Sequence, residues 1–191
     1  MKTKFLIGVV LMSAALFAPA QAKKPLAADE AAAREIVAKV YEGYSSPTDD
    51  MATEGVEAVE GGPDTYEPPY TATLGAQVSR WSKLMMATDE LYGLNSFDWY
   101  CQCQDFDSKT AKIVKQSYRS TGKDRIDGNI LFSPGWVEKG QAGAPLLFRF
   151  KREGGKWKLD DLKFDAGGTL RKDLDSDIKD ATRDQAKAAG S

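Results

Sequence analysis

The sequence predicts an α+β fold in which two N-terminal helices pack on a curved antiparallel sheet, followed by a short C-terminal helix. Three observations lead to this fold class. Apolar residues recur at helical spacing before residue 92, and they alternate with polar residues after residue 111. Short turns join the strands directly, which suits antiparallel neighbours, and the helices precede the strands instead of interleaving with them. With 191 residues, the chain is long enough for one domain with a substantial core.

Residues 1–22 have the pattern of a secretory signal peptide. Lys2 and Lys4 precede an apolar run over residues 5–18, and Ala20-Gln21-Ala22 forms a small-residue cleavage site. The apolar run is shorter than the roughly 20 residues that a membrane-spanning helix needs. We therefore expect an exported, periplasmic protein cleaved after Ala22 and without a membrane span. Its mature net charge is −4, because the removed segment carries two lysines and no acidic residue.

The composition excludes several classes of function. The chain has no histidine, which rules out Ser/His and Cys/His nucleophile pairs and the commonest general base. The acidic balance of 26 Lys and Arg against 28 Asp and Glu argues against a nucleic-acid partner. No phosphate-binding glycine motif occurs, and we expect no cofactor and no metal centre.

Two helices are predicted in the N-terminal half. The first covers residues 29–44, with Asp29 as its N-terminal cap; its apolar stripe contains Ala33, Ile36, Val37, Val40, Tyr41 and Tyr44. The second covers residues 73–91 and stops at Gly93, with Trp81 in the core and Leu74, Val78, Leu84 and Met85 on the same face. Residues 47–69 between them are rich in Asp, Glu, Gly and Pro, which predicts a long acidic surface loop with a helical turn near residues 51–59.

Alternating patterns predict strands over residues 111–120, over residues 126–132 and in a hairpin over residues 145–164. The last strand has a parity problem. Trp157 and Leu159 share one face of a regular strand, whereas Leu162 and Phe164 share the opposite face. One extra residue at Asp160-Asp161 returns all four to the same side, so we predict a β-bulge there.

The chain is expected to end in a helix over residues 169–186 with Leu170, Leu174 and Ile178 on its apolar face. We place the domain over residues 23–174 and a charged helical tail over residues 175–191, with fraying from Asp184 onward.

Cys101 and Cys103 are the only cysteines of a chain that is expected to reach an oxidising compartment. A disulfide between them requires a local bend, because residues two apart on an extended strand lie near the upper distance limit for such a bond. Two separate thiols and an intermolecular bridge are the alternatives. Two thiolates without histidine make an incomplete zinc site.

The densest candidate site spans residues 98–107. Carboxylates among aromatic residues can have a raised pKa, so Asp98 and Asp105 are the candidate catalytic bases. Candidate ligand-binding residues are Asp98, Trp99, Gln104 and Asp105. The same carboxylates with Gln104 could bind calcium. The structural alternative is that Asp98 and Asp105 accept hydrogen bonds from backbone amides and fix a turn between helix and sheet.

Four segments together resemble an exported bacterial family, domain-of-unknown-function family 3828, in the nuclear-transport-factor-2-like (cystatin-like) superfamily. They are Val40-Tyr41-Glu42-Gly43-Tyr44, Phe97-Asp98-Trp99-Tyr100-Cys101-Gln102-Cys103-Gln104-Asp105, Gly155-Lys156-Trp157-Lys158-Leu159-Asp160-Asp161-Leu162 and Leu170-Arg171-Lys172-Asp173-Leu174. The resemblance spans about residues 28–174. It implies a cone-shaped fold whose concave sheet can hold a pocket, and it implies no activity.

Two functions follow as hypotheses. The first is a periplasmic binding or interaction module for an unidentified protein or small molecule, for example an immunity-type protein that neutralises a toxin; a structural envelope component is not distinguishable from it. The second is a small-molecule isomerase or dehydratase with Asp98 or Asp105 as its base. A deep apolar pocket with one of these carboxylates at its floor would favour the enzyme, and a filled interior would favour the module.

Overall fold

The computed structural model describes residues 27–45, 66–88, 92–135, 143 and 145–190. It confirms the α+β class. The signal peptide, most of the acidic loop and its expected turn lie outside the described residues. The elements in order are α1 (Ala27–Ser45), α2 (Ala72–Met85), the short 3-10 helix η1 (Gly93–Ser96), β1 (Lys112–Gly122), β2 (Arg125–Ser133), β3 (Pro145–Glu153), β4 (Lys156–Lys163) and α3 (Leu170–Ala189).

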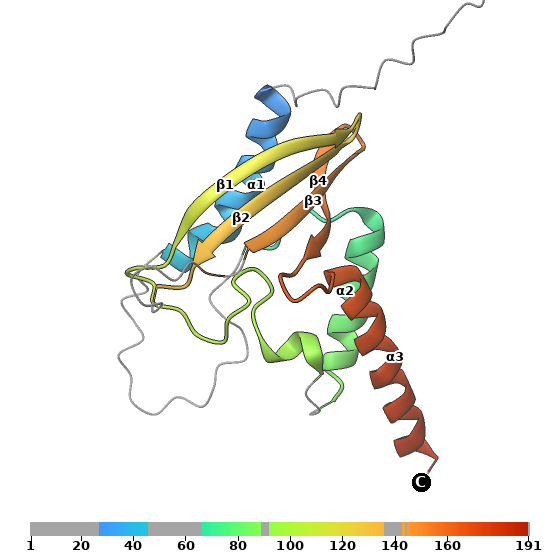
Figure 1. Cartoon of the computed structure of the whole chain (residues 1–191). Helices are drawn as coiled ribbons and strands as arrows, with labels where there is room; N and C mark the ends of the chain where they lie inside the picture. Colours follow the sequence, from blue (N-terminus) through green and yellow to red (C-terminus); the bar gives the residue numbers. More distant parts are fainter. Residues whose placement is uncertain (1–26, 46–65, 89–91, 136–142, 144, 191) are drawn as a thin grey trace, which may run out of the picture.

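The four strands form one curved antiparallel sheet in the order β1-β2-β3-β4 (Figure 1). Helix α1 crosses one face, while α2 and α3 pack against each other beside β4. The face toward α1 is called the inner face here. Its apolar side chains are buried: Ile126, Ile130, Phe132, Leu146, Phe148, Phe150, Trp157, Leu159 and Leu162. Burial of each large apolar side chain contributes about 1.5–3 kcal/mol, so this layer is the main source of stability.

Helix α1 follows its predicted stripe, and all six predicted apolar positions are buried. Its first turn differs from the expectation. The helix begins at Ala27, so Asp29 lies inside the first turn and is not the cap. Its carboxylate instead forms an ion pair with Arg152 and accepts a hydrogen bond from Trp157 Nε1 (3.1 Å). These contacts fasten the start of α1 to the β3–β4 hairpin.

The predicted β-bulge is confirmed. Arg149 pairs with Asp161 and Phe150 pairs with Leu159, which leaves Asp160 as the extra residue of β4. Because of this insertion, Trp157, Leu159, Leu162 and Phe164 are all buried. The bulge therefore lets β4, together with Phe164 directly after it, contribute four large side chains to the core in spite of their mixed parity.

Helix α2 is shorter than predicted. It ends at Met85 and not at Leu91, and Gly93 begins η1, a helix that the sequence analysis missed. Only Leu74 of its apolar face is fully buried; Val78 and Trp81 are partly buried against the core. The helix η1 is anchored by a distant residue, because the backbone N–H of Leu94 donates to the Asp177 carboxylate (3.0 Å).

Helix α3 starts where the pattern predicts, with the Thr169 hydroxyl accepting from the Lys172 N–H at its N-terminus. It continues without a break to Ala189, three residues beyond the predicted end, and so passes through residue 174, where the sequence analysis begins the charged tail. Beyond that position Asp177, Ile178 and Ala181 are buried, and α3 packs along α2. The first part of the tail is thus continuous with the folded domain.

Candidate functional site

Cys101 and Cys103 form a disulfide, with their Cα atoms 5.1 Å apart. The predicted bend is at Gln102, whose φ of 52° lies in the left-handed region that side-chain-bearing residues seldom adopt. Both cysteines are 8% exposed. The disulfide therefore closes a tight turn at the edge of the core.

Asp98 organises that turn. Its Oδ1 accepts hydrogen bonds from the Tyr44 hydroxyl (2.5 Å), the Tyr100 N–H (2.8 Å) and the Cys101 N–H (3.2 Å). Its backbone N–H donates to the Cys103 carbonyl (2.9 Å). Tyr44 is fully buried on α1. Asp98 thus joins α1 to the disulfide turn, which is the structural role that the sequence left open as an alternative to catalysis.

The other candidate residues of this segment have separate surroundings. Trp99 donates from Nε1 to the Leu94 carbonyl (2.8 Å) and packs edge-on against Trp81. Gln104 is exposed and donates to the Ser96 carbonyl (3.2 Å), and Asp105 is also exposed. Among the described residues, no group of three or more Asp, Glu, His or Cys side chains is placed to hold a metal ion.

Aromatic side chains fill the space between α1 and the sheet. Tyr41 donates to the Tyr100 carbonyl (2.7 Å), and the Tyr70 and Tyr100 hydroxyls are hydrogen-bonded (2.8 Å). Tyr41 stacks on Phe132 with ring centroids 4.6 Å apart. Burial raises the pKa of Tyr70 to about 12, and it raises the pKa of Tyr41 and Tyr100 well above the ordinary value. These phenols stay neutral at any physiological pH and act as packing groups with a satisfied polar end.

A cavity of about 280 Å³ lies away from the Asp98 turn. It is open to the surface and is lined by α1, by Tyr66 and Pro69, and by residues 155–157 at the turn between β3 and β4. Neither Asp98 nor Asp105 lines it. The cavity therefore does not place either candidate base beside a small-molecule site.

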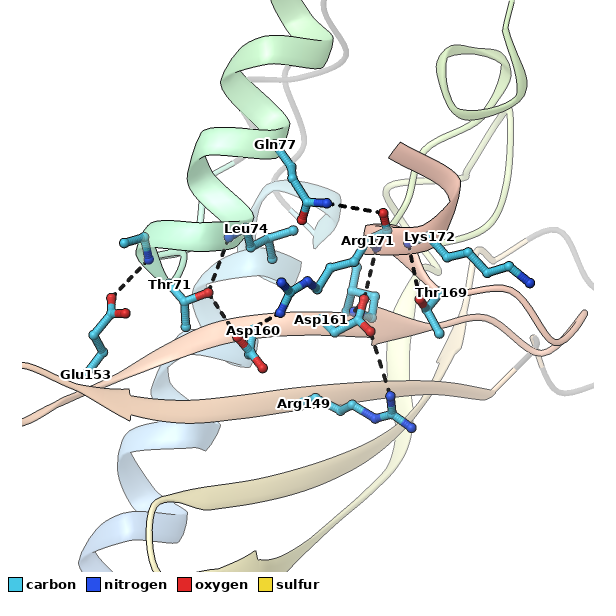
Figure 2. A network of polar contacts seen from close by, with 12 residues as sticks. Thr71, Leu74, Gln77, Arg149, Glu153, Asp160, Asp161, Thr169, Arg171 and Lys172 are labelled. Atoms are coloured by element: carbon cyan, nitrogen blue, oxygen red, sulfur yellow. Dashed lines mark hydrogen bonds and ion pairs between the residues drawn. The ribbon is translucent and has the colours of Figure 1, made fainter. Parts of the chain in front are cut away.

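The bulge in β4 holds a second polar cluster (Figure 2). Asp160 Oδ1 accepts from the Thr71 hydroxyl (3.0 Å) and pairs with Arg171 (3.4 Å). Asp161 Oδ1 accepts from the backbone N–H groups of Leu162 (3.0 Å) and Arg171 (3.1 Å), and its Oδ2 pairs with Arg149 (3.7 Å). Burial raises the pKa of Asp161 in spite of these donors. The two carboxylates connect β4 to the N-terminal ends of α2 and α3.

The face of the sheet opposite α1 is called the outer face here. None of the described helices covers it over β1, β2 and β3 (Figure 1). The register places Arg119, Asp127, Arg149 and Asp161 in one row across all four strands. Their charges alternate, with ion pairs between Arg119 and Asp127 (3.8 Å) and between Arg149 and Asp161 (3.7 Å). This row supports the sheet through opposite charges on adjacent strands.

In the next row of the outer face, all the charged side chains are cations. Arg125 pairs with Lys151, and Lys151 pairs with Lys158, on three successive strands. Lys158 forms an ion pair with Glu153 (2.9 Å), whose carboxylate also accepts from the first N–H of α2. Like charges directly opposite one another destabilise a sheet. The fold therefore tolerates an electrostatic cost at this row.

The outer face as a whole is basic, although the chain is acidic. By register it carries nine Lys and Arg residues against four Asp and Glu, the bulged Asp160 included. The basic residues are Lys112, Lys115, Arg119, Arg125, Arg149, Lys151, Lys156, Lys158 and Lys163. The sequence analysis did not find this surface. Part of its signal was present in the alternation, since Arg125, Arg149 and Lys158 occupy polar positions beside buried residues of these strands.

The sequence analysis also missed the structural role of Asp177. It is buried on α3, and its Oδ2 accepts from Trp81 Nε1 (3.2 Å) as well as from the Leu94 N–H. Its position on the face of Leu170, Leu174 and Ile178 could have indicated a buried acceptor.

Within the described part of the chain, no helix has the length and apolar character needed to cross a membrane. No family model, curated protein or solved structure matches the chain.

Proposed function

We propose that the chain is an exported interaction module that binds an acidic partner protein through the outer face of its sheet. One observation carries the proposal: a chain with more acidic than basic residues gathers nine cations on one face of its sheet, and six of them lie on β1, β2 and β3, where the described helices leave that face uncovered. A surface of one sign steers a partner of the opposite sign and excludes partners of like sign.

The composition of the outer face favours a protein over other polyanions. It carries apolar residues beside its charged rows, because Leu131 pairs with Pro145 at the end of the β2–β3 ladder and Leu147 lies one row away. Protein interfaces combine apolar contacts with charged and polar ones in this way. No aromatic residue occupies an outer-face position, so a stacking platform for single-stranded nucleic acid is absent from these strands. The alternating row through Arg119 would fix the orientation of the partner.

The filled interior of the domain supports a function at its surface. Asp98 accepts hydrogen bonds from three donors, and aromatic rings fill the space between α1 and the sheet, where the family resemblance implies a pocket. The immunity-type protein, which neutralises a toxin by binding it, is one form of such a module. We also propose that the domain belongs to the nuclear-transport-factor-2-like superfamily and has its cone-shaped fold. The order of two helices before a curved antiparallel sheet supports this assignment.

Periplasmic export is part of the proposal and is supported by the Cys101–Cys103 disulfide, since such bonds persist in oxidising compartments. The intact mass of the protein recovered from the periplasm, with and without thiol alkylation, tests it. We expect the mass of residues 23–191 with no alkylated cysteine. A mass that retains residues 1–22 would contradict export with cleavage.

The interaction surface is tested by an NMR titration of the mature, oxidised protein with polyglutamate. We expect amide shifts concentrated on outer-face positions of β1, β2 and β3, weakening as salt screens the charges. The double variant Arg125→Glu/Lys151→Glu should bind at least tenfold more weakly. Lys83→Glu/Lys179→Glu is the matched control, because it changes the net charge equally at exposed positions on α2 and α3. Equal affinity of the two variants would refute the assignment of the surface.

A further inference from the structure

The two edges of the sheet differ. The free side of β4 is covered, because residues 69–71 run beside it in parallel: the Thr71 N–H donates to the Leu159 carbonyl (2.9 Å), and the Leu159 N–H donates to the Pro69 carbonyl (2.8 Å). Within the described residues β1 pairs only with β2. The sheet thus presents one open edge, with backbone donors and acceptors available for a further strand.

Strand β1 is long and accessible. It contains 11 residues, none of which is fully buried. The register shift between Ile113 and Lys115 leaves Val114 unpaired as a bulge, and Val114 is 51% exposed. An exposed apolar side chain on an open edge can be covered by a strand that docks alongside.

The charges along β1 determine which kind of strand can pair with this edge. Residues 108–123 contain five Lys and Arg and no acidic residue. A second copy of the chain that paired antiparallel about Ser117 would set Lys115 opposite the copy's Arg119, so like charges would face each other at both ends. The edge therefore disfavours self-association, which is a common function of lysines on edge strands. An acidic extended segment meets no such repulsion.

We propose that the partner contributes an acidic extended segment that adds to β1 as a fifth strand, an inference that rests on the proposed function. On β1, the outer-face residues Lys115 and Arg119 are separated by one other outer-face residue, Ser117. An added strand lies about 4.8 Å from β1, and its alternate side chains share that face. Carboxylates at alternate positions would therefore lie beside both cations, and the main chain would bond to the open edge. The outer face and the edge of β1 then form one continuous binding surface.

Two ten-residue peptides separate strand addition from simple charge attraction. The first alternates Glu and Thr, and the second has the same sequence with every backbone amide N-methylated, which keeps the charges and removes the donors. Affinity is measured by fluorescence anisotropy, and amide hydrogen exchange of the mature protein is followed with each peptide. We expect the N-methylated peptide to bind at least tenfold more weakly, and only the first peptide to slow exchange in β1.

The outcomes distinguish the inference from the function on which it rests. Equal binding of both peptides would overturn strand addition and leave charge-based docking on the outer face intact. Binding of neither peptide would contradict the proposed function itself. Lys115→Glu/Arg119→Glu should lower the affinity for the first peptide at least tenfold, while Lys83→Glu/Lys179→Glu should leave it unchanged. A peptide-free dimer in sedimentation that Lys115→Glu/Arg119→Glu dissociates would assign the edge to a second copy and overturn the inference.

Discussion

Replacing Asp98 with alanine tests whether this carboxylate is a structural anchor. The change removes the acceptor of three hydrogen bonds, from the Tyr44 hydroxyl and from the N–H groups of Tyr100 and Cys101. A buried donor left without a partner costs about 1–3 kcal/mol. Tyr44 is fully buried and cannot turn to water, whereas the turn amides can regain part of their hydration. We expect a loss of about 4 kcal/mol in the free energy of unfolding.

The assay is urea denaturation of the mature, oxidised protein, with a thermal scan in parallel. A loss of this size corresponds to a fall in the melting temperature of roughly 10 °C for a domain of this length. Tyr44→Phe removes one of the three bonds and should cost about 1 kcal/mol. In a double-mutant cycle, Asp98→Ala and Tyr44→Phe should couple by about 1 kcal/mol, because they share that bond.

Asp105→Ala is the matched control, since it removes an exposed carboxylate from the same segment. We expect it to change the free energy of unfolding by less than about 0.5 kcal/mol. If Asp98→Ala and Asp105→Ala unfold at the same urea concentration, the anchoring role of Asp98 is wrong.

Three further predictions concern the supports around this turn. Cys101→Ala/Cys103→Ala should cost only ~1.5 kcal/mol in urea denaturation, because the disulfide closes a very short loop; a loss of several kcal/mol would contradict that reasoning. Asp177→Ala should cost about 2–3 kcal/mol and shift the tryptophan emission, because Trp81 and Leu94 both lose their acceptor; an unchanged emission would show that Trp81 does not depend on it. Raising the pH should unfold the protein in a window that begins near 10 and is well advanced by 12. The unfolded chain releases tyrosine protons near pH 10, whereas burial raises the pKa of Tyr70 to about 12 and raises the pKa of Tyr41 and Tyr100 well above the ordinary value. Tyrosinate absorbance and circular dichroism should then change together, and tyrosinate formation at full native circular dichroism would refute the buried cluster.

The fold was largely predictable because apolar spacing reports burial directly. The stripe of α1 and the mixed parity of Trp157, Leu159, Leu162 and Phe164 were sufficient to predict a buried helix face and a bulge. Element ends were less predictable. Helix α2 ends at Met85, and Leu94 beyond it donates to distant Asp177, a contact that no local pattern encodes.

The candidate site was harder to predict, because residue type does not reveal what a carboxylate contacts. The density of acids and aromatics around Asp98 is typical both of a catalytic centre and of a hydrogen-bonded turn, and only the positions of Tyr44 and the turn amides favour the second. The basic outer face depends on register. Arg125, Lys151 and Lys158 are scattered along the sequence and become a row only when the strands are aligned.

The most direct test of the interaction surface is a four-way binding measurement. The affinities of the mature protein and of its Arg125→Glu/Lys151→Glu variant are measured for polyglutamate and for polylysine at one low salt concentration. If the outer face is the binding surface, the unaltered protein should prefer polyglutamate. The variant should shift the ratio of the two affinities toward polylysine at least tenfold. The same ratio of affinities for both proteins would show that the charge of the outer face does not choose the partner.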